Sequence, residues 1–453
     1  MKLFNTLSRR KEDFVPVKPD EIGIYVCGPT TYNLIHAGNA RPYVVFDVLW
    51  RFMEYLGYNV KYVQNFTDID DKIIQKARDE NISFLDISNR YIDEFFVDAD
   101  ALNIRRAHFY PRVTAEISGI IDLVQLLVDK NFAYEKNGTV YFISKLADNY
   151  GKLSKKNISE LEAGARVEAN PDKINPSDFV LWKAAKPGEP SWDSPWGPGR
   201  PGWHIECSVM ARKFLGCVVD IHAGGEDLMF PHHENEIAQS EAEMDGPFVN
   251  YWLHNGMLLV DNQKMAKSEG NFFLVRDVAA KYNYPLLRFF LLSVHYRSPL
   301  NFSEELLKAA AAGFERIRNC RRALAEHGAG AGEAGFIKAF KAALADDLNT
   351  ANAISTIFDL VKAANIALRE GAEAAVLQGF LAELDLMCDL LGLVISSESG
   401  VDSSEIENLI SERNSAKAAK NWALADEIRN RLHTLGVVIE DTREGTKWHL
   451  TNT

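Results

Sequence analysis

The sequence predicts an α/β fold: a doubly wound parallel sheet of the Rossmann-like type, with an insertion, an α-helical bundle and a small C-terminal module. Apolar runs at Ile22–Cys27 and Val60–Asn65 flank a helical pattern at Arg41–Leu56. A strand, a helix and a second strand in this order imply parallel strands joined by a right-handed crossover. A strand–helix pair returns at 218–243, and apolar residues keep helical spacing over 303–393.

The segment between the two strand–helix regions has a different pattern. Residues 111–190 contain a helical stretch, a hairpin signal at Asn137-Gly138 and lysine-rich connections, without alternation of strands and helices. The sheet pattern resumes with a strand at Val218–Ile221, a helix at Pro231–Glu243 and a strand near Gly256–Val260. We therefore expect a sheet domain in two halves, 1–110 and 191–302, separated by an insertion at 111–190.

The C-terminal third of the chain is predicted to be mainly helical. A glycine-rich connection at 328–332 joins helices of a bundle at 303–395, and a polar linker at 396–404 follows. The last part, 403–453, is predicted to be a separate module. It would contain two helices and a hairpin, namely Glu405–Ala419, Trp422–Leu435, Val437–Asp441 and Thr446–Leu450.

Composition limits the class of protein. The chain has 453 residues with a net charge of -13, and 47% of them are hydrophobic, which suggests about three globular domains. No stretch approaches the roughly 18 apolar residues of a membrane span, and the first 14 residues are charged where a signal peptide is apolar. Five cysteines without a C-x-x-C pair fit a reducing compartment. We therefore expect a cytoplasmic protein with no membrane partner.

The acidic charge bears on nucleic-acid binding. Affinity for phosphates comes from Lys and Arg replacing counterions, so a net charge of -13 argues against a chain that is basic all over. A local basic stripe on an acidic protein can still hold a folded RNA. Composition alone therefore does not decide this question.

Two short segments have the chemistry of a nucleotide site. The loop Gly28–Asn39 follows the first strand, where parallel sheets bind nucleotides beside helix N-termini. In it, His36 can stabilise charge on a phosphate and Gly38 allows close backbone approach. Far downstream, Lys264 and Lys267 stand three residues apart in a polar turn, suited to the phosphates of ATP. The simpler alternatives are an uninvolved loop histidine and a solvated lysine loop.

A third segment, His222–Asp227, follows the strand at 218–221 and contains two glycines. Gly224 and Gly225 suit backbone contact with ribose or adenine, and Asp227 can accept hydrogen bonds from hydroxyls. A tight turn is the alternative.

Four residues have the chemistry of a zinc site. His232 and Glu236 lie four apart on a predicted helix and hence on one face. Together with Cys27 and Cys207 they would supply two thiolates, an imidazole and a carboxylate. The alternatives are buried structural cysteines and a salt-bridged helix face, because nothing in the spacing brings Cys27 to Cys207.

The first two segments together resemble the HIGH and KMSKS signatures of class I aminoacyl-tRNA synthetases. They stand here as His36-Ala-Gly-Asn39 and Lys264-Met-Ala-Lys-Ser268. Asn39 replaces a histidine and Ala266 replaces a serine. Asn39 can still donate a hydrogen bond but cannot be cationic, whereas both lysines are intact.

Longer motifs resemble the cysteinyl-tRNA synthetase family of bacterial type. They are Cys27–Tyr32 (CGPTTY), Asn65–Asp71 (NFTDIDD), Pro201–Cys207 (PGWHIEC) and Pro231–Glu236 (PHHENE), and the match extends to the last residues. The resemblance implies an enzyme that activates L-cysteine with ATP and Mg²⁺ and transfers it to the 3′-terminal adenosine of cysteine tRNA. It also implies one zinc ion per chain that contacts the substrate thiol. A monomer is expected.

The resemblance further implies roles for individual residues. Catalytic roles fall to His36, Asn39, Lys264 and Lys267, and ATP binding to Gly38, Gly224, Gly225, Asp227, Lys267 and Ser268. The zinc ligands would be Cys27, Cys207, His232 and Glu236, with Thr67 and Trp203 at the amino-acid pocket. We take Glu236 as the weakly held ligand, because a closed four-ligand site leaves no room for the substrate.

The C-terminal module is the candidate for tRNA recognition. Aromatic and charged side chains there suit stacking on single-stranded bases and contact with phosphates and base edges. The stretches Ala425–Arg429, Glu440–Thr442 and Gly445–Trp448 resemble the anticodon-reading end of the same family. The alternative is a self-contained packing module. The candidate contacts are Trp422, Asp426, Arg429, Asp441 and Trp448.

Three other functions stay open at this point. A related ligase could transfer cysteine to a small amine in thiol-cofactor synthesis, using the same active-site motifs. The changes at Asn39 and Ala266 permit a catalytically inactive RNA-binding paralogue. A metallohydrolase could use zinc-activated water with Glu234 as the base, although His36 and the lysines would then be unexplained.

Overall fold

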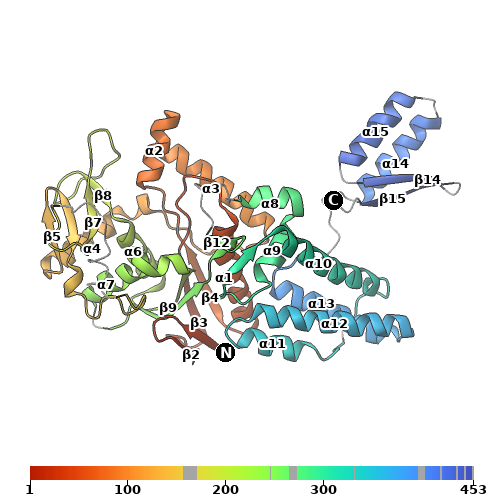
Figure 1. Cartoon of the computed structure of the whole chain (residues 1–453), viewed down its shortest axis with the longest axis horizontal. Helices are drawn as coiled ribbons and strands as arrows, with labels where there is room; N and C mark the ends of the chain where they lie inside the picture. Colours follow the sequence, from red (N-terminus) through yellow and green to blue (C-terminus); the bar gives the residue numbers. More distant parts are fainter. Residues whose placement is uncertain are drawn as a thin grey trace. The chain divides into compact units, whose positions relative to one another are not determined.

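A computed structural model of the chain forms two compact units, Met1–Val394 and Ile395–Thr453 (Figure 1). Each unit is described by itself. The structure describes residues 1–156, 171–244, 246–264, 273–330, 332–395, 403–418, 421–434, 437–442 and 445–450.

A four-stranded parallel sheet forms the centre of the first unit. Strands β3 (Glu21–Val26), β4 (Asn59–Gln64), β9 (Val219–Gly225) and β10 (Val249–Asn255) are arranged in the order β10-β9-β3-β4. Every neighbouring pair in this sheet is parallel. Helix α1 (Ala37–Tyr55) connects β3 to β4. The predicted fold class, a doubly wound parallel sheet, is confirmed.

The edge strand β10 (Val249–Asn255) of the parallel sheet was not predicted. The strand predicted near Gly256–Val260 is present as β11 (Leu258–Val260), but it lies in a separate three-stranded sheet. That sheet also contains β12 (Gln263–Lys264) and β13 (Leu300–Phe302). Polar residues such as His254 interrupt the apolar pattern of β10, yet His254 is buried because side chains pack on both faces of the strand.

Two helix boundaries also differ from the prediction. Helix α1 begins at Ala37 rather than Arg41, because His36 caps its N-terminus. Helix α7 (Glu234–Glu243) begins after a wider helical turn, η4 (Met229–His233), that contains a cis peptide before Pro231. His232 therefore lies on the turn, and Glu236 lies on the helix that follows.

The insertion forms an antiparallel sheet beside the parallel one. Helix α4 (Ile117–Asp129) precedes a sheet of four strands in the order β5-β6-β7-β8, the last of which lies beyond residue 190. The hairpin between β5 and β6 turns at Asn137-Gly138, both with positive φ as a tight two-residue turn requires. The strands are β5 (Ala133–Lys136), β6 (Thr139–Phe142), β7 (Phe179–Ala184) and β8 (Gly199–Pro201).

Further helices and a hairpin complete the first unit. Figure 1 shows the insertion (yellow) and the bundle (blue-green) on opposite sides of the parallel sheet. The remaining elements are β1 (Lys2–Asn5), β2 (Arg10–Asp13), α2 (Asp71–Glu80), α3 (Phe84–Ala101), α6 (Trp203–Leu215), α8 (Val275–Tyr282), α9 (Tyr284–Leu292), α10 (Glu304–Ala325), α11 (Ile337–Ala345), α12 (Thr350–Glu370) and α13 (Ala374–Leu390), with short turns η1 (Val113–Ala115), η2 (Ser144–Leu146) and η3 (Glu226–Leu228).

The second unit has its own small core. Helices α14 (Ser403–Ala418) and α15 (Trp422–Thr434) pack on a hairpin of β14 (Val437–Thr442) and β15 (Gly445–Leu450). Ile406, Ile428 and Leu432 are buried between them. Among the described residues of either unit, no helix is long and apolar enough to cross a membrane.

A buried ionic network joins the sheet domain to the bundle. Asp47 on α1 accepts hydrogen bonds from Arg51 at 2.8 Å and from Arg288 on α9. Both guanidinium groups also donate to backbone carbonyls at the C-terminal end of α13, for example Arg288 Nε to Leu391 O at 2.8 Å. Asp47 therefore neutralises two buried cations that hold the end of the bundle against α1.

We predict that Asp47→Asn lowers the free energy of unfolding of the first unit by about 3–5 kcal/mol, because both guanidinium groups lose a buried counter-charge. Chemical denaturation followed by circular dichroism measures this. Asp389→Asn is the matched control, since Asp389 faces Arg51 at 3.7 Å but is 72% exposed. The control should change stability by less than about 1 kcal/mol. Equal effects of the two variants would contradict the assigned role of Asp47.

Candidate active site and metal centre

The candidate site lies at the carboxyl ends of β3 and β9. Cys27 directly follows β3, and its backbone N–H donates to Ala223 O on β9 at 3.2 Å. The next residue, Gly28, passes close to the segment after β4, where a Cβ would lie 1.6 Å from Asn65 O. Any side chain at this position would collide with that backbone, so the turn after Cys27 requires glycine.

The structure brings the four predicted ligands together. The Sγ of Cys27 lies 4.0 Å from the Sγ of Cys207, although the residues are 180 apart in sequence. Glu236 Oε1 lies 4.0 Å from Cys27 Sγ and 3.0 Å from His232 Nε2. One potential ligand atom from each of the four residues lies within 4.8 Å of the others, and all four residues are buried. Helix α6 supplies Cys207, while η4 and α7 supply His232 and Glu236.

A second, overlapping cluster was missed by the sequence analysis. His222 on β9 and His233 on η4 point their Nε2 atoms at Cys27 Sγ, at 3.5 and 3.3 Å. With Cys27 and Glu236 they form another group of four potential ligands. His233 thus contacts Cys27 directly. Its place beside His232 in the Pro231–Glu236 motif was the available signal.

Further histidines extend this cluster. His204 Nδ1 lies 3.0 Å from His232 Nδ1, and His233 Nδ1 lies 2.8 Å from His254 Nε2. Burial lowers the pKa of His204, His222 and His233, and it lowers the pKa of His254 to about 3. These four imidazoles are therefore neutral, which is the form that binds metals.

The pKa values of the thiols and of the carboxyl in the cluster are also shifted. Burial raises the pKa of the Cys27 thiol and of the Glu236 carboxyl. The hydrogen bond from Cys27 lowers the pKa of Cys207 to about 7. Because the pKa of Cys27 is raised and the pKa of Cys207 is lowered, the Cys207 thiol ionises first.

One buried oxygen indicates what the cluster can hold. Among the described residues, Glu236 Oε2 has no hydrogen-bond partner, and the His222 Nε2 atom lies 3.6 Å away. A buried carboxylate oxygen without a donor is costly, and a cation would remove that cost. Two sulfurs with an imidazole and a carboxylate are donors that suit a borderline-soft ion such as zinc. The residues present therefore fit a metal ion.

Thr67 and Trp203 lie around this cluster. The Thr67 hydroxyl donates to Glu206 Oε2 at 3.2 Å on α6, one residue from Cys207. Trp203 is 42% exposed and stacks on His232 with ring centroids 4.4 Å apart. The indole thus covers the outer side of His232 and still faces open space.

His36 and Asn39 cap helix α1 reciprocally. The backbone N–H of Asn39 donates to His36 Nδ1 at 3.2 Å, and the side-chain oxygen of Asn39 accepts from the His36 N–H at 3.5 Å. Because Nδ1 accepts a hydrogen bond, the proton of the neutral ring lies on Nε2. His36 is thereby held as a donor at the N-terminus of a 19-residue helix, where anions bind.

The segment after the lysine loop is joined to this helix start. Ala37 N–H donates to Phe273 O at 3.0 Å, and Val275 N–H donates to Ile35 O at 3.1 Å. At the other end of the loop, the backbone of Lys264 belongs to β12. Lys267, Ser268 and the side chain of Lys264 lie outside the described residues.

The turn after β9 has the close packing that its glycines suggest. A Cβ on Gly225 would lie 2.3 Å from Asp227 Oδ1, and one on Gly224 would lie 2.9 Å from Leu228. Asp227 is exposed at this end of the sheet. The predicted nucleotide contacts Gly224, Gly225 and Asp227 therefore lie at the carboxyl end of β9, two to five residues past His222.

The Glu234 side chain is occupied by structural hydrogen bonds and is therefore unsuited to act as a general base. Its side chain is 1% exposed and accepts three backbone N–H groups, from Gly151, Leu153 and Ser154, at 3.0, 3.3 and 2.7 Å. Both carboxylate oxygens are thus engaged. This removes the feature on which the metallohydrolase hypothesis depended.

The predicted RNA contacts differ in exposure. Trp422 is 60% exposed, and Asp426 and Arg429 are exposed on α15. Trp448 is half-buried and packs against the core of the second unit. The side chain of Asp441 lies outside the described part of the chain.

The other three cysteines differ in burial. Cys320 and Cys388 are buried, whereas Cys217 is exposed. Cys217 comes two residues after the end of α6, where the chain turns outward through Gly216.

Three protein families match successive parts of the chain. Residues 13–312 match the family described as tRNA synthetases class I (C) catalytic domain, residues 339–395 match the DALR domain, and residues 403–448 match the cysteinyl-tRNA ligase anticodon binding domain. Among solved structures, a methionyl-tRNA synthetase of Mycobacterium tuberculosis in complex with methionyl-adenylate is similar at a TM-score of 0.57 and 15% identity. The match covers 86% of this chain and 94% of that one, and it supports the fold alone.

Full-length relatives are much more similar in sequence. The cysteine–tRNA ligase of Lachnoclostridium phytofermentans is 51% identical over 99% of both chains. That of Geobacillus thermodenitrificans is also 51% identical, over 99% of this chain and 98% of the relative. Identity at this level over nearly the whole length is decisive, and the chain belongs to the cysteine–tRNA ligase family of class I aminoacyl-tRNA synthetases.

Proposed function

We propose that this protein is an enzyme that activates L-cysteine with ATP, releasing pyrophosphate, and then transfers cysteine to the 3′-terminal adenosine of cysteine tRNA. The observation that carries this proposal is the buried group of Cys27, Cys207, His232 and Glu236 at the carboxyl ends of the parallel strands. It is a site for a thiol-selective metal beside a nucleotide-type helix N-terminus.

The first step needs orientation and charge neutralisation. The cysteine carboxylate attacks the α-phosphate of ATP, and no covalent protein intermediate is required. His36 Nε2–H and the amide of Asn39 would donate to phosphate oxygens, and Gly38 leaves the helix N-terminus open. Lys264, Lys267 and Ser268 would hold the departing pyrophosphate, with Mg²⁺ accompanying ATP. Gly224, Gly225 and Asp227 would contact the adenosine.

Selection of cysteine would depend on the metal ligands. Serine differs from cysteine by one atom, and an apolar pocket rejects such an analogue by only about a hundredfold. Zinc, one ion per chain, would supply a soft Lewis acid that favours a thiolate over a hydroxyl. Thr67 and Trp203 would bound the amino-acid pocket. Glu236 is proposed as the most weakly held ligand, because a closed four-ligand site leaves no room for the substrate.

The second unit supports tRNA rather than a small amine as the acceptor. It is a separately packed module with exposed Trp422, Asp426 and Arg429, and activation of cysteine alone would not need it. Trp448 and Asp441 complete the contacts that we propose for the tRNA. We also propose that the enzyme works in the cytoplasm as a monomer.

We predict that the purified protein holds about one zinc ion per chain and that Cys207→Ser loses most of it, because a hydroxyl is a poor substitute for a thiolate ligand. Elemental analysis by mass spectrometry measures the content. Cys320→Ser, which changes a buried cysteine of the bundle, should keep its zinc. A full complement of zinc in Cys207→Ser would remove Cys207 from the ligand set.

We also expect Lys267→Ala to slow adenylate formation by about 100-fold while changing the KM for cysteine little, because its charge acts on phosphates in the transition state. Cysteine-dependent exchange of pyrophosphate into ATP gives both parameters. Lys281→Ala serves as the control, since Lys281 is an exposed lysine paired with Glu304. Unaltered exchange in Lys267→Ala would mean that the lysine is merely solvated.

Removal of the second unit should separate the activation of cysteine from its transfer to tRNA. A chain that ends before Ser403 should retain nearly normal pyrophosphate exchange, because the first unit packs independently. It should charge cysteine tRNA far more slowly, as measured by aminoacylation with labelled cysteine. Normal charging by the truncated chain, or cysteinylation of a small amine alone by the intact one, would overturn the proposal.

A further inference from the structure

Three cations lie beside the candidate metal site. Arg9 lies in the turn between β1 and β2, and Lys155 and Lys156 lie in the loop that follows the insertion's hairpin. All three side chains belong to exposed residues. Within the described ranges, none of the three pairs with a carboxylate, whereas the neighbouring Lys11 and Lys152 pair with Asp346 and Glu241. We call Arg9, Lys155 and Lys156 the basic edge.

The basic edge is held in place by neutral partners. Arg9 Nη2 donates to Leu153 O at 3.2 Å, and Lys155 Nζ donates to Leu7 O at 3.4 Å, so the two segments bind each other reciprocally. Lys156 Nζ lies 4.3 Å from the ring centre of Phe230. Carbonyls and a ring orient these cations without cancelling their charge, which leaves a positive surface on a protein of net charge -13.

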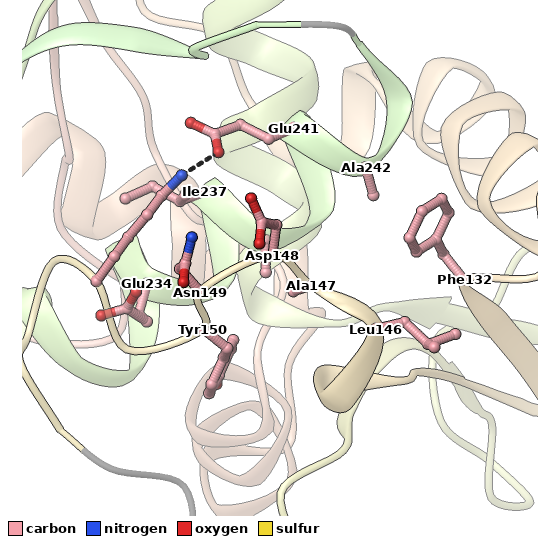
Figure 2. Close-up of a pocket in the computed structure, with 12 residues that line it drawn as sticks. Phe132, Leu146, Ala147, Asp148, Asn149, Tyr150, Glu234, Ile237, Glu241 and Ala242 are labelled. Atoms are coloured by element: carbon pink, nitrogen blue, oxygen red, sulfur yellow. Dashed lines mark hydrogen bonds and ion pairs between the residues drawn. The ribbon is translucent and has the colours of Figure 1, made fainter.

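The loop that carries the two lysines is fixed to the site by Glu234. Besides the three N–H groups that Glu234 accepts, Tyr150 donates its hydroxyl to Asn235, and Lys152 pairs with Glu241. Figure 2 shows this loop running across α7, with Glu234 and Glu241 turned toward it. Gly151 lies at φ +95, where a side chain would be strained, and a Cβ on it would lie 2.1 Å from Lys156 O. The loop is therefore a tightly built turn.

The basic edge also adjoins the histidine cluster. Thr6, three residues before Arg9, contacts His254 Nδ1 through its hydroxyl at 2.9 Å, and His254 contacts His233. Phe230, under Lys156, is two residues from the candidate ligand His232. The edge thus lies beside β10, at the margin of the sheet opposite β4.

We propose that the basic edge binds backbone phosphates near the 3′ end of the tRNA while the terminal adenosine is in the active site. This inference rests on the proposed function. The 3′ hydroxyl must reach the adenylate, so the preceding phosphates pass along the margin of the site, and unpaired cations there supply the favourable electrostatic contact. Glu234 is then a positioning residue, because it fixes the loop that presents Lys155 and Lys156.

The triphosphate of ATP is the competing ligand. It already has a phosphate site at the N-terminus of α1, which follows β3, and the strand order places β9 and β10 between that helix start and the basic edge. Two strand spacings amount to about 10 Å. The experiment therefore measures the kinetic parameters for tRNA and for ATP separately.

The test is the double variant Lys155→Gln with Lys156→Gln in the full chain. We expect kcat/KM for cysteine tRNA to fall about tenfold, and the slope of log(kcat/KM) against log[salt] to become shallower by about 1.4–2 for two lost phosphate contacts. The KM for ATP in pyrophosphate exchange should not change. The double change to arginine should restore charging, because it keeps both charges.

Lys61→Gln is the matched control. Lys61 is exposed, lies 5.1 Å from the Phe109 ring and sits on β4 at the other margin of the sheet, so its loss should leave the salt slope unchanged. An unchanged slope and unchanged kcat/KM in the glutamine variant would overturn the inference, and a raised KM for ATP alone would assign the edge to the triphosphate. If the wild-type protein exchanges pyrophosphate but charges no tRNA, the proposed function itself fails.

Discussion

The parallel pairing of β3 with both β4 and β9 is the constraint on which the site depends. It aligns the carboxyl ends of three strands, so that Cys27, Asn65 and Gly225 come from distant parts of the sequence to one end of the sheet. Gly28 then passes within contact of Asn65 O, and the Cys27 N–H extends the hydrogen bonding to β9. The position of Cys27 is therefore set by backbone geometry, and the helices α6 and α7 bring the other donors to it.

Burial gives this site its chemistry. Thiols, imidazoles and a carboxyl lie within a few ångströms of one another away from water, where ionised forms are disfavoured unless a partner compensates them. Glu236 Oε2 has no such partner among the described residues, and the histidines are held neutral. A cation of matching softness held by these donors would satisfy that oxygen. The same low polarity would strengthen its preference for a substrate thiolate.

The sequence was sufficient for local structure and for chemistry that lies within one motif. The crossover unit, the hairpin at Asn137-Gly138 and the two helices of the C-terminal unit follow from periodicity and turn residues. The contact between Cys27 and Cys207 does not, because it depends on tertiary pairing, and only the family resemblance suggested it. β10 was not predicted because His254 in it is buried by contacts with Thr6 and His233, whereas a polar residue in the sequence pattern is expected to be exposed. The cap made by His36 was missed for a similar reason, since histidine rarely serves as a helix N-cap.

The distribution of charge explains how an acidic chain can handle anionic substrates. Several basic groups of the first unit pair with carboxylates: Arg288 and Arg51 neutralise Asp47, and Lys11 and Lys152 pair with Asp346 and Glu241. Cations without a carboxylate partner among the described residues can form a local positive surface on a chain of net charge -13. Association with a polyanion is governed by the local potential where phosphates approach, and repulsion from the rest of the acidic surface disfavours binding elsewhere. An acidic surface with a few oriented cations thus favours one docking position of a nucleic acid over many weak ones.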